Sequence, residues 1–224
     1  MNSYLADYPI KLEKHIIYLN NVTKNSNENV EGNYFSLFNN GTDINKQLDY
    51  TYKKQANLYY ISSLVPNNAN VCEIGFNAGH SSIIILTAST NKNINFVIFD
   101  IGEHIYLKPC LEYVKSIFID TNINFIEGNS ITTIPEFIKN TKDVIFNYDL
   151  IHIDGGHTEE CITNDMKNAN ILIKKGGIIV IDDTNLKCIN DVVDKYIKIG
   201  DYEEIKIFNI DEHNLPHRII KKII

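Results

Sequence analysis

The sequence predicts an α/β protein built on a doubly wound, mostly parallel sheet of seven strands, with a helical extension at its N-terminus. Three observations lead to this prediction. From residue 70 onward, short apolar segments alternate with segments of helical periodicity, the order expected of a parallel sheet. The segments 95–99 and 178–181 are continuously apolar, as strands are when helices cover both faces of their sheet. A glycine-containing turn joins the first strand, at 70–75, to the helix that follows it.

The N-terminal part of the chain has a helical pattern without enough apolar residues for a core of its own. Apolar side chains recur at helical spacing over 4–19 and again over 44–64, and the polar, Asn-rich stretch 20–33 predicts a loop between them. We therefore expect a helical extension and lid at 1–65 and a single α/β domain at 66–224.

Alternating strands and helices fill that domain. The strands are expected at 70–75, 94–100, 123–127, 148–154 and 177–182. The helices are expected at 81–90, 108–119, 131–140, 158–174 and 186–198. Two final β-rich segments, 203–210 and 217–224, predict an antiparallel pair at one edge of the sheet.

The composition is that of a globular protein and argues against several classes of partner. Of the 224 residues, 44% are hydrophobic and 22% are charged, a balance typical of packed domains. The net charge of −7 provides no attraction to nucleic acid or to an acidic membrane, and the apolar runs are too short to span a bilayer. The N-terminal residues lack the pattern of a signal peptide. The expected partner is thus a small molecule.

The spacing of the cysteines is that expected of a protein in a reducing compartment. Cys72, Cys110, Cys161 and Cys188 form no C-x-x-C pair, so neither a zinc site nor a redox motif is predicted. Free thiols are the simplest interpretation, and we expect a cytoplasmic protein.

The turn after the first strand has the composition of a cofactor-binding loop. It begins at Glu73 with the sequence E-I-G-F-N-A-G-H-S, in which Gly75 and Gly79 allow a positive φ or a close approach to a ligand. A dinucleotide-binding loop requires G-x-G-x-x-G, but Asn77 stands at the second glycine position, which disfavours a nicotinamide dehydrogenase. An acid at Glu73 suits a positively charged ligand end better than a phosphate.

The motif E-I-G-F-N-A-G-H-S resembles the first motif of class I S-adenosylmethionine-dependent methyltransferases, which have a Rossmann-like fold. The resemblance implies that the residues contacting S-adenosyl-L-methionine include Glu73, Gly75, Asn77, Gly79 and Ser81. Ser81 and Ser82 can in addition cap the helix that follows. An ordinary glycine-rich turn between a strand and a helix is the alternative.

Polar residues follow every strand of the predicted parallel sheet, where ligands of such sheets bind. Asp100, 25 positions after Gly75, can accept hydrogen bonds from both ribose hydroxyls of a nucleoside, whereas capping of the next helix is the alternative. Asn129 and Ser130 fall where the resembled family contacts the adenine edge, although that family often has an acid at position 129. Asp154, after the fourth strand, completes the expected cofactor site.

Three carboxylates follow the fourth and fifth strands. Asp154, Asp182 and Asp183 would repel one another unless a cation or protonation neutralises them, and a hard divalent ion fits such oxygen ligands. The segments I-D-G-G-H and G-G-I-I-V-I-D-D-T resemble those of metal-dependent O-methyltransferases. This resemblance implies that the three residues hold Mg²⁺ or another divalent cation. Capping of loops or helices by one or two of them is the alternative.

His157 lies three residues after Asp154, at the position where catechol-type members of the resembled group carry a lysine base. Sugar-modifying members have histidine there, so we expect a sugar or a small polyhydroxylated metabolite as acceptor, with catechols as the alternative. An ordinary imidazole, with a pKa of about 6.5, can accept a hydroxyl proton near neutrality. A loop histidine without a catalytic role is the other interpretation.

The sequence therefore predicts an S-adenosylmethionine-dependent O-methyltransferase that uses a divalent cation, with His157 as the base. Two rival hypotheses remain. One is a metal-dependent hydroxylase on the same scaffold, with Asp154 and His157 as ligands. The other is a catalytically inactive cofactor-binding protein.

Three further expectations concern single elements. The aromatic segment 34–38 permits a homodimer contact without requiring one. Tyr52, Gln55 and Tyr59 lie on the second predicted helix and are expected to cover the cofactor. His152, inside the fourth strand, is expected to be a hydrogen-bonded core residue.

Overall fold

The computed structural model describes residues 8–28, 50–207 and 217–224, which form seven helices and seven strands. The strands are β1 (Asn70–Ile74), β2 (Asn95–Asp100), β3 (Asn122–Glu127), β4 (Tyr148–Ile153), β5 (Ile173–Ile181), β6 (Tyr202–Glu204) and β7 (Arg218–Lys222). The helices are α1 (Tyr8–Asn25), α2 (Tyr50–Ser63), α3 (His80–Ala88), α4 (Leu107–Ile117), α5 (Ser130–Asn140), α6 (Glu159–Leu172) and α7 (Lys187–Lys198).

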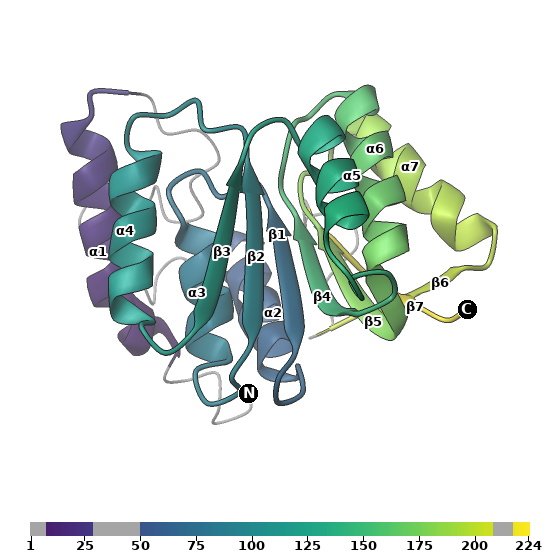
Figure 1. Ribbon diagram of the computed structural model, residues 1–224, viewed down its shortest axis with the longest axis horizontal. Helices are drawn as coiled ribbons and strands as arrows, with labels where there is room; N and C mark the ends of the chain where they lie inside the picture. Colours follow the sequence, from purple (N-terminus) through teal and green to yellow (C-terminus); the bar gives the residue numbers. More distant parts are fainter. Residues whose placement is uncertain (1–7, 29–49, 208–216) are drawn as a thin grey trace.

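All seven strands belong to one sheet, in the order β3-β2-β1-β4-β5-β7-β6 (Figure 1). Strands β1 to β5 run parallel to one another, whereas β7 runs antiparallel to both β5 and β6. This topology confirms the predicted doubly wound, mostly parallel sheet with an antiparallel pair at one edge. Because the order reverses between β1 and β4, the loops after these two strands are placed where such sheets bind ligands.

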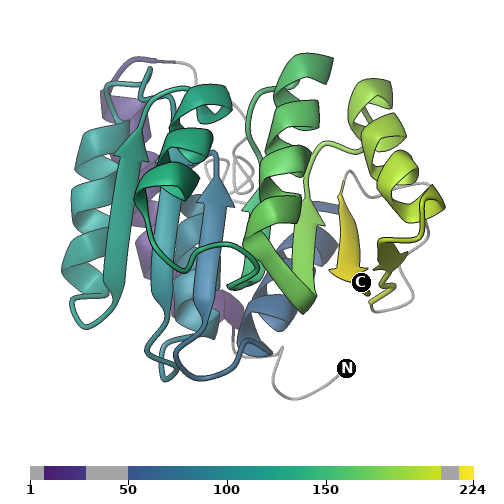
Figure 2. The ribbon, with the colours of Figure 1, turned by 45° about the vertical axis from the view of Figure 1, so that its right-hand side comes forward.

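Helices cover both faces of the sheet and create two apolar cores (Figure 2). The first core joins α1, α2, α3 and α4 to the sheet and includes Leu12, Leu58 and Ile84. The second lies under α5, α6 and α7 and includes Ile134 and Met166. The described part of the N-terminal extension thus shares its core with the α/β domain. Its role as a lid stays a prediction.

Helix α1 continues to Asn25, so the predicted loop from residue 20 is wrong over its first six positions. Polar side chains in this stretch are buried because they find partners. The Asn20 amide oxygen lies 2.8 Å from Nε2 of His80, and the Thr23 hydroxyl donates to the Asn20 carbonyl. Residues 26–28 of the predicted loop form a turn and a bend, whereas 29–33, the segment 34–38 and the first residues of the second predicted helix lie outside the described residues.

Helix α3 is capped by Gly79, with φ of 80°, and not by the predicted serines. Ser82 lies inside the first turn, where its hydroxyl donates to the carboxylate of Glu73. Ser81 is buried in the same turn. The expectation that these serines cap the helix is therefore wrong, because Glu73 provides a stronger acceptor for Ser82 than the helix end.

Strand β5 begins at Ile173, directly after α6, and not near residue 177 as predicted. Ile173 pairs with Tyr148, and the pairing then shifts before Leu150 meets Ile178. The irregularity contains two lysines and two glycines, whose composition predicts a turn. A search for apolar runs therefore misses the part of a strand that contains such a bulge.

The free energy of unfolding should depend on pH through His80, the first residue of α3, which contacts Asn20 of α1. His80 is 5% exposed, and burial lowers its pKa to about 3. An unfolded chain takes up this proton near pH 6.5, so the residue destabilises the fold increasingly as the pH falls below that value. Linkage predicts a loss of about 2 kcal/mol between pH 7 and pH 5 from this residue alone.

Urea unfolding at both pH values measures the effect. The variant His80→Gln should lose about 2 kcal/mol less than the wild type over the same interval. Equal losses in the two proteins would contradict a buried neutral imidazole at position 80.

Candidate active site

The loops after β1 to β5 meet at the carboxyl edge of the sheet, as predicted. Backbone hydrogen bonds of 2.8–2.9 Å continue the ladder past the strand ends and join these loops: Gly128 N to Asp100 O, Gly75 N to Phe99 O, Asp154 N to Ile74 O, and Asp182 N to Ile153 O. The sheet itself therefore fixes the first residue of each loop. Side chains that follow these positions are held in place before any ligand binds.

The glycine turn after β1 is packed against the loop after β4. Gly75 has φ of 94°, and a Cβ atom at this position would lie 1.9 Å from the carbonyl oxygen of Asp154. Gly79 is similarly restricted, since a Cβ there would lie 2.6 Å from the ring of Phe76. Asn77 has a positive φ of 49°, and its side-chain oxygen accepts a hydrogen bond from the Tyr106 hydroxyl at 2.7 Å. The turn is thus preorganised by its surroundings.

Asp100 holds this turn through its carboxylate. Oδ2 accepts hydrogen bonds from the backbone nitrogens of Phe76 and Asn77 at 2.7 and 2.9 Å, and Oδ1 accepts one from Gly102 at 2.8 Å. An ionised carboxylate offers about four acceptor positions, of which three are used here. At most one position is left for a ribose hydroxyl, fewer than the two expected from the sequence.

Glu73 lies beneath the turn and not at its surface, contrary to its predicted contact with the cofactor. The side chain is fully buried, its Oε2 accepts the Ser82 hydroxyl, and its Oε1 lies 3.0 Å from Nδ1 of His152. Burial by itself lowers the pKa of His152, but the hydrogen bond and charge of Glu73, together with the charges of Asp154 and Asp182, outweigh burial and raise it. His152 is confirmed as a hydrogen-bonded core residue, and Glu73 connects β1, β4 and α3.

Asn129 and Ser130 stand at the start of α5, after β3. The Asn129 side-chain oxygen accepts a hydrogen bond from the Ile131 nitrogen at 3.0 Å, so the residue is the N-cap of the helix. This oxygen retains one further lone pair, which could accept a hydrogen bond from the adenine edge. Ser130 is the first residue of the helix and is partly buried.

The three acidic residues lie together, but they do not surround one point. Donor atoms of Asp154, His157 and Asp183 lie within 4.8 Å of one another. A second group of the same size joins His152, Asp154 and Asp182. Asp154 belongs to both groups, whereas Asp182 and Asp183 are divided between them.

A lysine that the sequence analysis overlooked neutralises Asp182. The Lys54 ammonium, on α2, forms an ion pair with Asp182 Oδ2, and the two side chains are only 11% and 2% exposed. Oδ1 of Asp182 accepts the backbone N–H of Asp183 at 2.7 Å. A signal for Lys54 did exist, because it shares a helical stripe with the buried residues Leu58 and Ile61.

The acidic cluster retains an excess of negative potential. Burial raises the pKa of Asp154 and of Asp183, and the charge of Asp182 raises both further. Lys54 acts in the opposite direction on both carboxyls, as do the neighbouring histidines. The cluster therefore favours an additional proton or cation.

His157 and Asp183 form a pair at the solvent-accessible side of this cluster. The distance between His157 Nε2 and Asp183 Oδ2 is 2.7 Å, and the histidine side chain is 58% exposed. Asp183 has φ of 53°, a strained conformation for a non-glycine residue of the kind found preferentially at functional sites. An imidazole oriented by a carboxylate and open to solvent can act as a general base.

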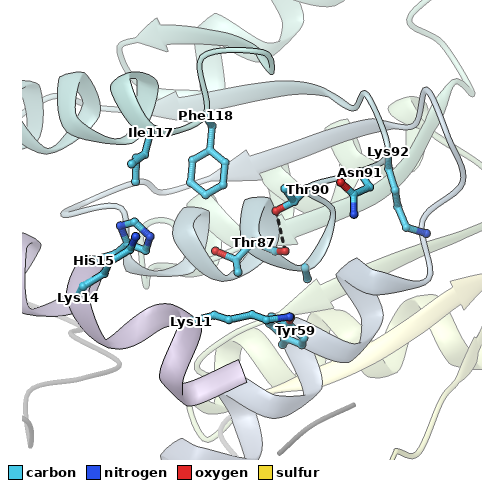
Figure 3. A pocket seen from close by; sticks show the side chains of 11 residues that line it. Lys11, Lys14, His15, Tyr59, Thr87, Thr90, Asn91, Lys92, Ile117 and Phe118 are labelled. Carbon is cyan, nitrogen blue, oxygen red and sulfur yellow. Dashed lines mark hydrogen bonds between the residues drawn. The ribbon is translucent and has the colours of Figure 1, made fainter. Parts of the chain in front are cut away.

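A cavity of about 750 Å³ lies away from this edge, near the end of α3 (Figure 3). Its polar walls do not converge on a common point: the Lys92 ammonium donates to the Val65 carbonyl, and His15 lies 3.0 Å from the Tyr113 hydroxyl. Tyr59 lines this cavity, so the expectation that it covers the cofactor is wrong. Gln55 is buried, and the side chain of Tyr52 lies outside the described residues.

None of the helices in the described part of the chain is long and apolar enough to cross a membrane.

No curated protein sequence matches the chain. Among solved structures, an O-methyltransferase from Bacillus cereus in complex with S-adenosylhomocysteine has a TM-score of 0.68 at 13% identity, covering 99% of this chain and 96% of the other.

Two further structures share the fold. The O-methyltransferase TomG from Streptomyces achromogenes, in complex with S-adenosylmethionine, has a TM-score of 0.61 at 12% identity and covers 77% of this chain and 80% of the other. CalS11, a TDP-rhamnose 3′-O-methyltransferase of calicheamicin biosynthesis, has a TM-score of 0.59 at 16% identity, with 94% of each chain covered.

The sequence model of a family described as "Methyltransferase domain" matches residues 72–184, slightly more than half of the chain. The matched region runs from β1 to the loop after β5 and so contains the glycine turn, Asp100 and the acidic cluster. The chain therefore belongs to the S-adenosylmethionine-dependent methyltransferases.

Proposed function

We propose that the protein transfers the methyl group of S-adenosylmethionine to a hydroxyl of a sugar or another small polyhydroxylated metabolite. The observation that supports this most directly is the His157–Asp183 pair, with 2.7 Å between Nε2 and Oδ2, at the same sheet edge as the glycine turn. TomG and a TDP-rhamnose 3′-O-methyltransferase share the fold, and both are O-methyltransferases according to their names. They favour an oxygen acceptor.

The carboxyl edge fits a nucleoside cofactor. Gly75 and Gly79 let the turn pack closely against Asp154 and Phe76, which fixes its backbone at this edge beside Asn77 and Ser81. Asp100 offers one acceptor position for a ribose hydroxyl, while Asn129, Ser130 and Asp154 line the neighbouring loops. When bound there, the cofactor supplies a methyl group made electrophilic by its sulfonium.

His157 is the proposed base, assisted by Asp183. If Nε2–H donates to Asp183, Nδ1 is the nitrogen that takes the acceptor hydroxyl proton, and the carboxylate stabilises the imidazolium that results. The cofactor, if bound at this edge, would supply the methyl carbon to which the deprotonated oxygen bonds, with S-adenosylhomocysteine as the leaving group. Alignment by the fixed loops supplies part of the rate acceleration.

A divalent cation such as Mg²⁺ fits part of the predicted donor set. Asp154 and Asp183 present carboxylates near one another and near His157, whereas Asp182 is occupied by Lys54. A cation there would stabilise negative charge on the acceptor oxygen. The accessible group contains two carboxylates and one histidine, which differs from the two histidines and one carboxylate typical of iron hydroxylases. The hydroxylase hypothesis is therefore disfavoured.

A screen of sugar nucleotides, glycosides and catechols with radiolabelled S-adenosylmethionine tests the proposed reaction. On the best acceptor, His157→Ala should lower kcat roughly 100-fold or more, since the base is lost. Asp183→Asn should lower it about tenfold, because the imidazolium loses its charged partner.

Asp191→Asn, which breaks an exposed ion pair on α7, is the matched control and should leave kcat unchanged. Turnover of catechols alone would contradict the preference for sugars. Cofactor binding without turnover of any acceptor would favour an inactive binding protein.

The role of Asp100 can be tested by titrating S-adenosylhomocysteine in a calorimeter. Asp100→Ala should weaken binding roughly tenfold or more, because the cofactor loses a charged acceptor and the turn loses its anchor. Asp149→Asn, which alters a carboxylate at the opposite edge of the sheet, should bind normally. Unchanged affinity in Asp100→Ala would place the ribose elsewhere.

Dependence on a divalent cation can be measured separately from cofactor binding. Treatment with EDTA should lower kcat about tenfold or more, with recovery on adding Mg²⁺ and no change in affinity for S-adenosylhomocysteine. Asp154→Asn should not recover. Full activity in EDTA would remove the cation from the proposal and leave the His157–Asp183 pair as the base.

A further inference from the structure

Helix α2 brings a lysine into the acidic cluster. We propose that the Lys54 ammonium is an internal counter-ion for the cluster, and that it competes with a divalent cation for Asp182. The inference rests on the proposed function in one respect, namely that this cluster belongs to the active site. It assigns a role to a residue of the N-terminal extension that lies outside the matched methyltransferase region.

Burial makes the Lys54–Asp182 pair difficult to break without a substitute. Both side chains are almost fully removed from solvent, and a buried charge that loses its partner is strongly destabilising. Asp182 also accepts the Asp183 N–H, so its carboxylate is held on two sides. A cation that requires Asp182 as a ligand must therefore displace the ammonium.

A second contact fixes the helix at the same place. Asn57, one turn after Lys54, has its side-chain nitrogen 3.0 Å from Nε2 of the buried His217. His217 directly precedes β7, and the register pairs Ile181 with Arg218, so Asp182 and His217 lie at adjacent strand ends. Helix α2 is thus attached to two neighbouring points of the sheet edge, and Lys54 is held where it acts on the cluster.

The charge of Lys54 extends beyond Asp182. The charge of Lys54 acts to lower the pKa of Asp154 and of Asp183. It therefore offsets part of the negative charge of all three carboxylates. Without it, the cluster would bind a small cation more strongly. Two states follow: one in which Lys54 balances the cluster, and one in which a divalent cation replaces it at Asp182.

Titration with Mn²⁺, followed by the electron paramagnetic resonance signal of the free ion, distinguishes these states. Lys54→Gln should bind Mn²⁺ at least tenfold more tightly than the wild type, whereas Lys54→Arg, which keeps the charge, should not. Lys187→Gln removes an exposed lysine and serves as the matched control with wild-type affinity. Equal Mn²⁺ affinity in the wild type and Lys54→Gln would overturn the proposal.

A double variant guards against a failure of Lys54→Gln to fold. Lys54→Gln/Asp182→Asn removes both charges, so it should unfold at a higher temperature in EDTA than Lys54→Gln alone. It should also lose the tightened Mn²⁺ binding, because Asp182 is the contested ligand. Tight binding that persists in the double variant would overturn the proposal.

Calorimetry with S-adenosylhomocysteine separates this inference from the proposed function. A wild type that does not bind S-adenosylhomocysteine would contradict the proposed methyl transfer, while the comparison of Mn²⁺ affinities would still stand. Normal S-adenosylhomocysteine binding with Mn²⁺ affinities that do not respond to Lys54 would overturn only the role of Lys54.

Discussion

The structure depends on one buried carboxylate at the centre of the sheet. Glu73 lies between β1, β4 and the first turn of α3, and its oxygens are bonded to Ser82 and His152. A buried charge is tolerated only when its partners are in place, so these three elements are held in one arrangement. The glycine turn begins two residues later, so its position is set by that arrangement. Its geometry is a consequence of the core, and the cofactor does not have to create it.

Charge balance organises the other half of the site. Burial and the charge of Asp182 raise the pKa of Asp154 and of Asp183, and the neighbouring Lys54 and histidines oppose this effect. Lys54 neutralises Asp182, and His157 pairs with Asp183. The cluster is divided into a buried part, closed by the N-terminal extension, and a part accessible to solvent. This division separates the charge that stabilises the fold from the charge available for chemistry.

Sequence patterns predicted the parallel sheet, its edge pair and the positions of the polar loops, because these follow from apolar periodicity and from the rule that parallel strands end together. They failed where a polar side chain is buried by a partner distant in sequence. Ser82 was expected to cap a helix, and Glu73 to meet a ligand, because nothing local indicates that Ser82 bonds Glu73 or that Glu73 bonds His152. Lys54 was missed although its position in a buried helical stripe was a local signal, because its partner lies 128 positions away.

The contact between Asn57 and His217 spans 160 residues, nearly the whole described chain. A pairing of this kind closes a very large loop, and loop closure of that size is slow relative to the formation of local helices. During synthesis, helix α2 leaves the ribosome long before β7 exists to receive it. Helix α2 can therefore be attached to the sheet edge at this point only after His217 has been synthesised.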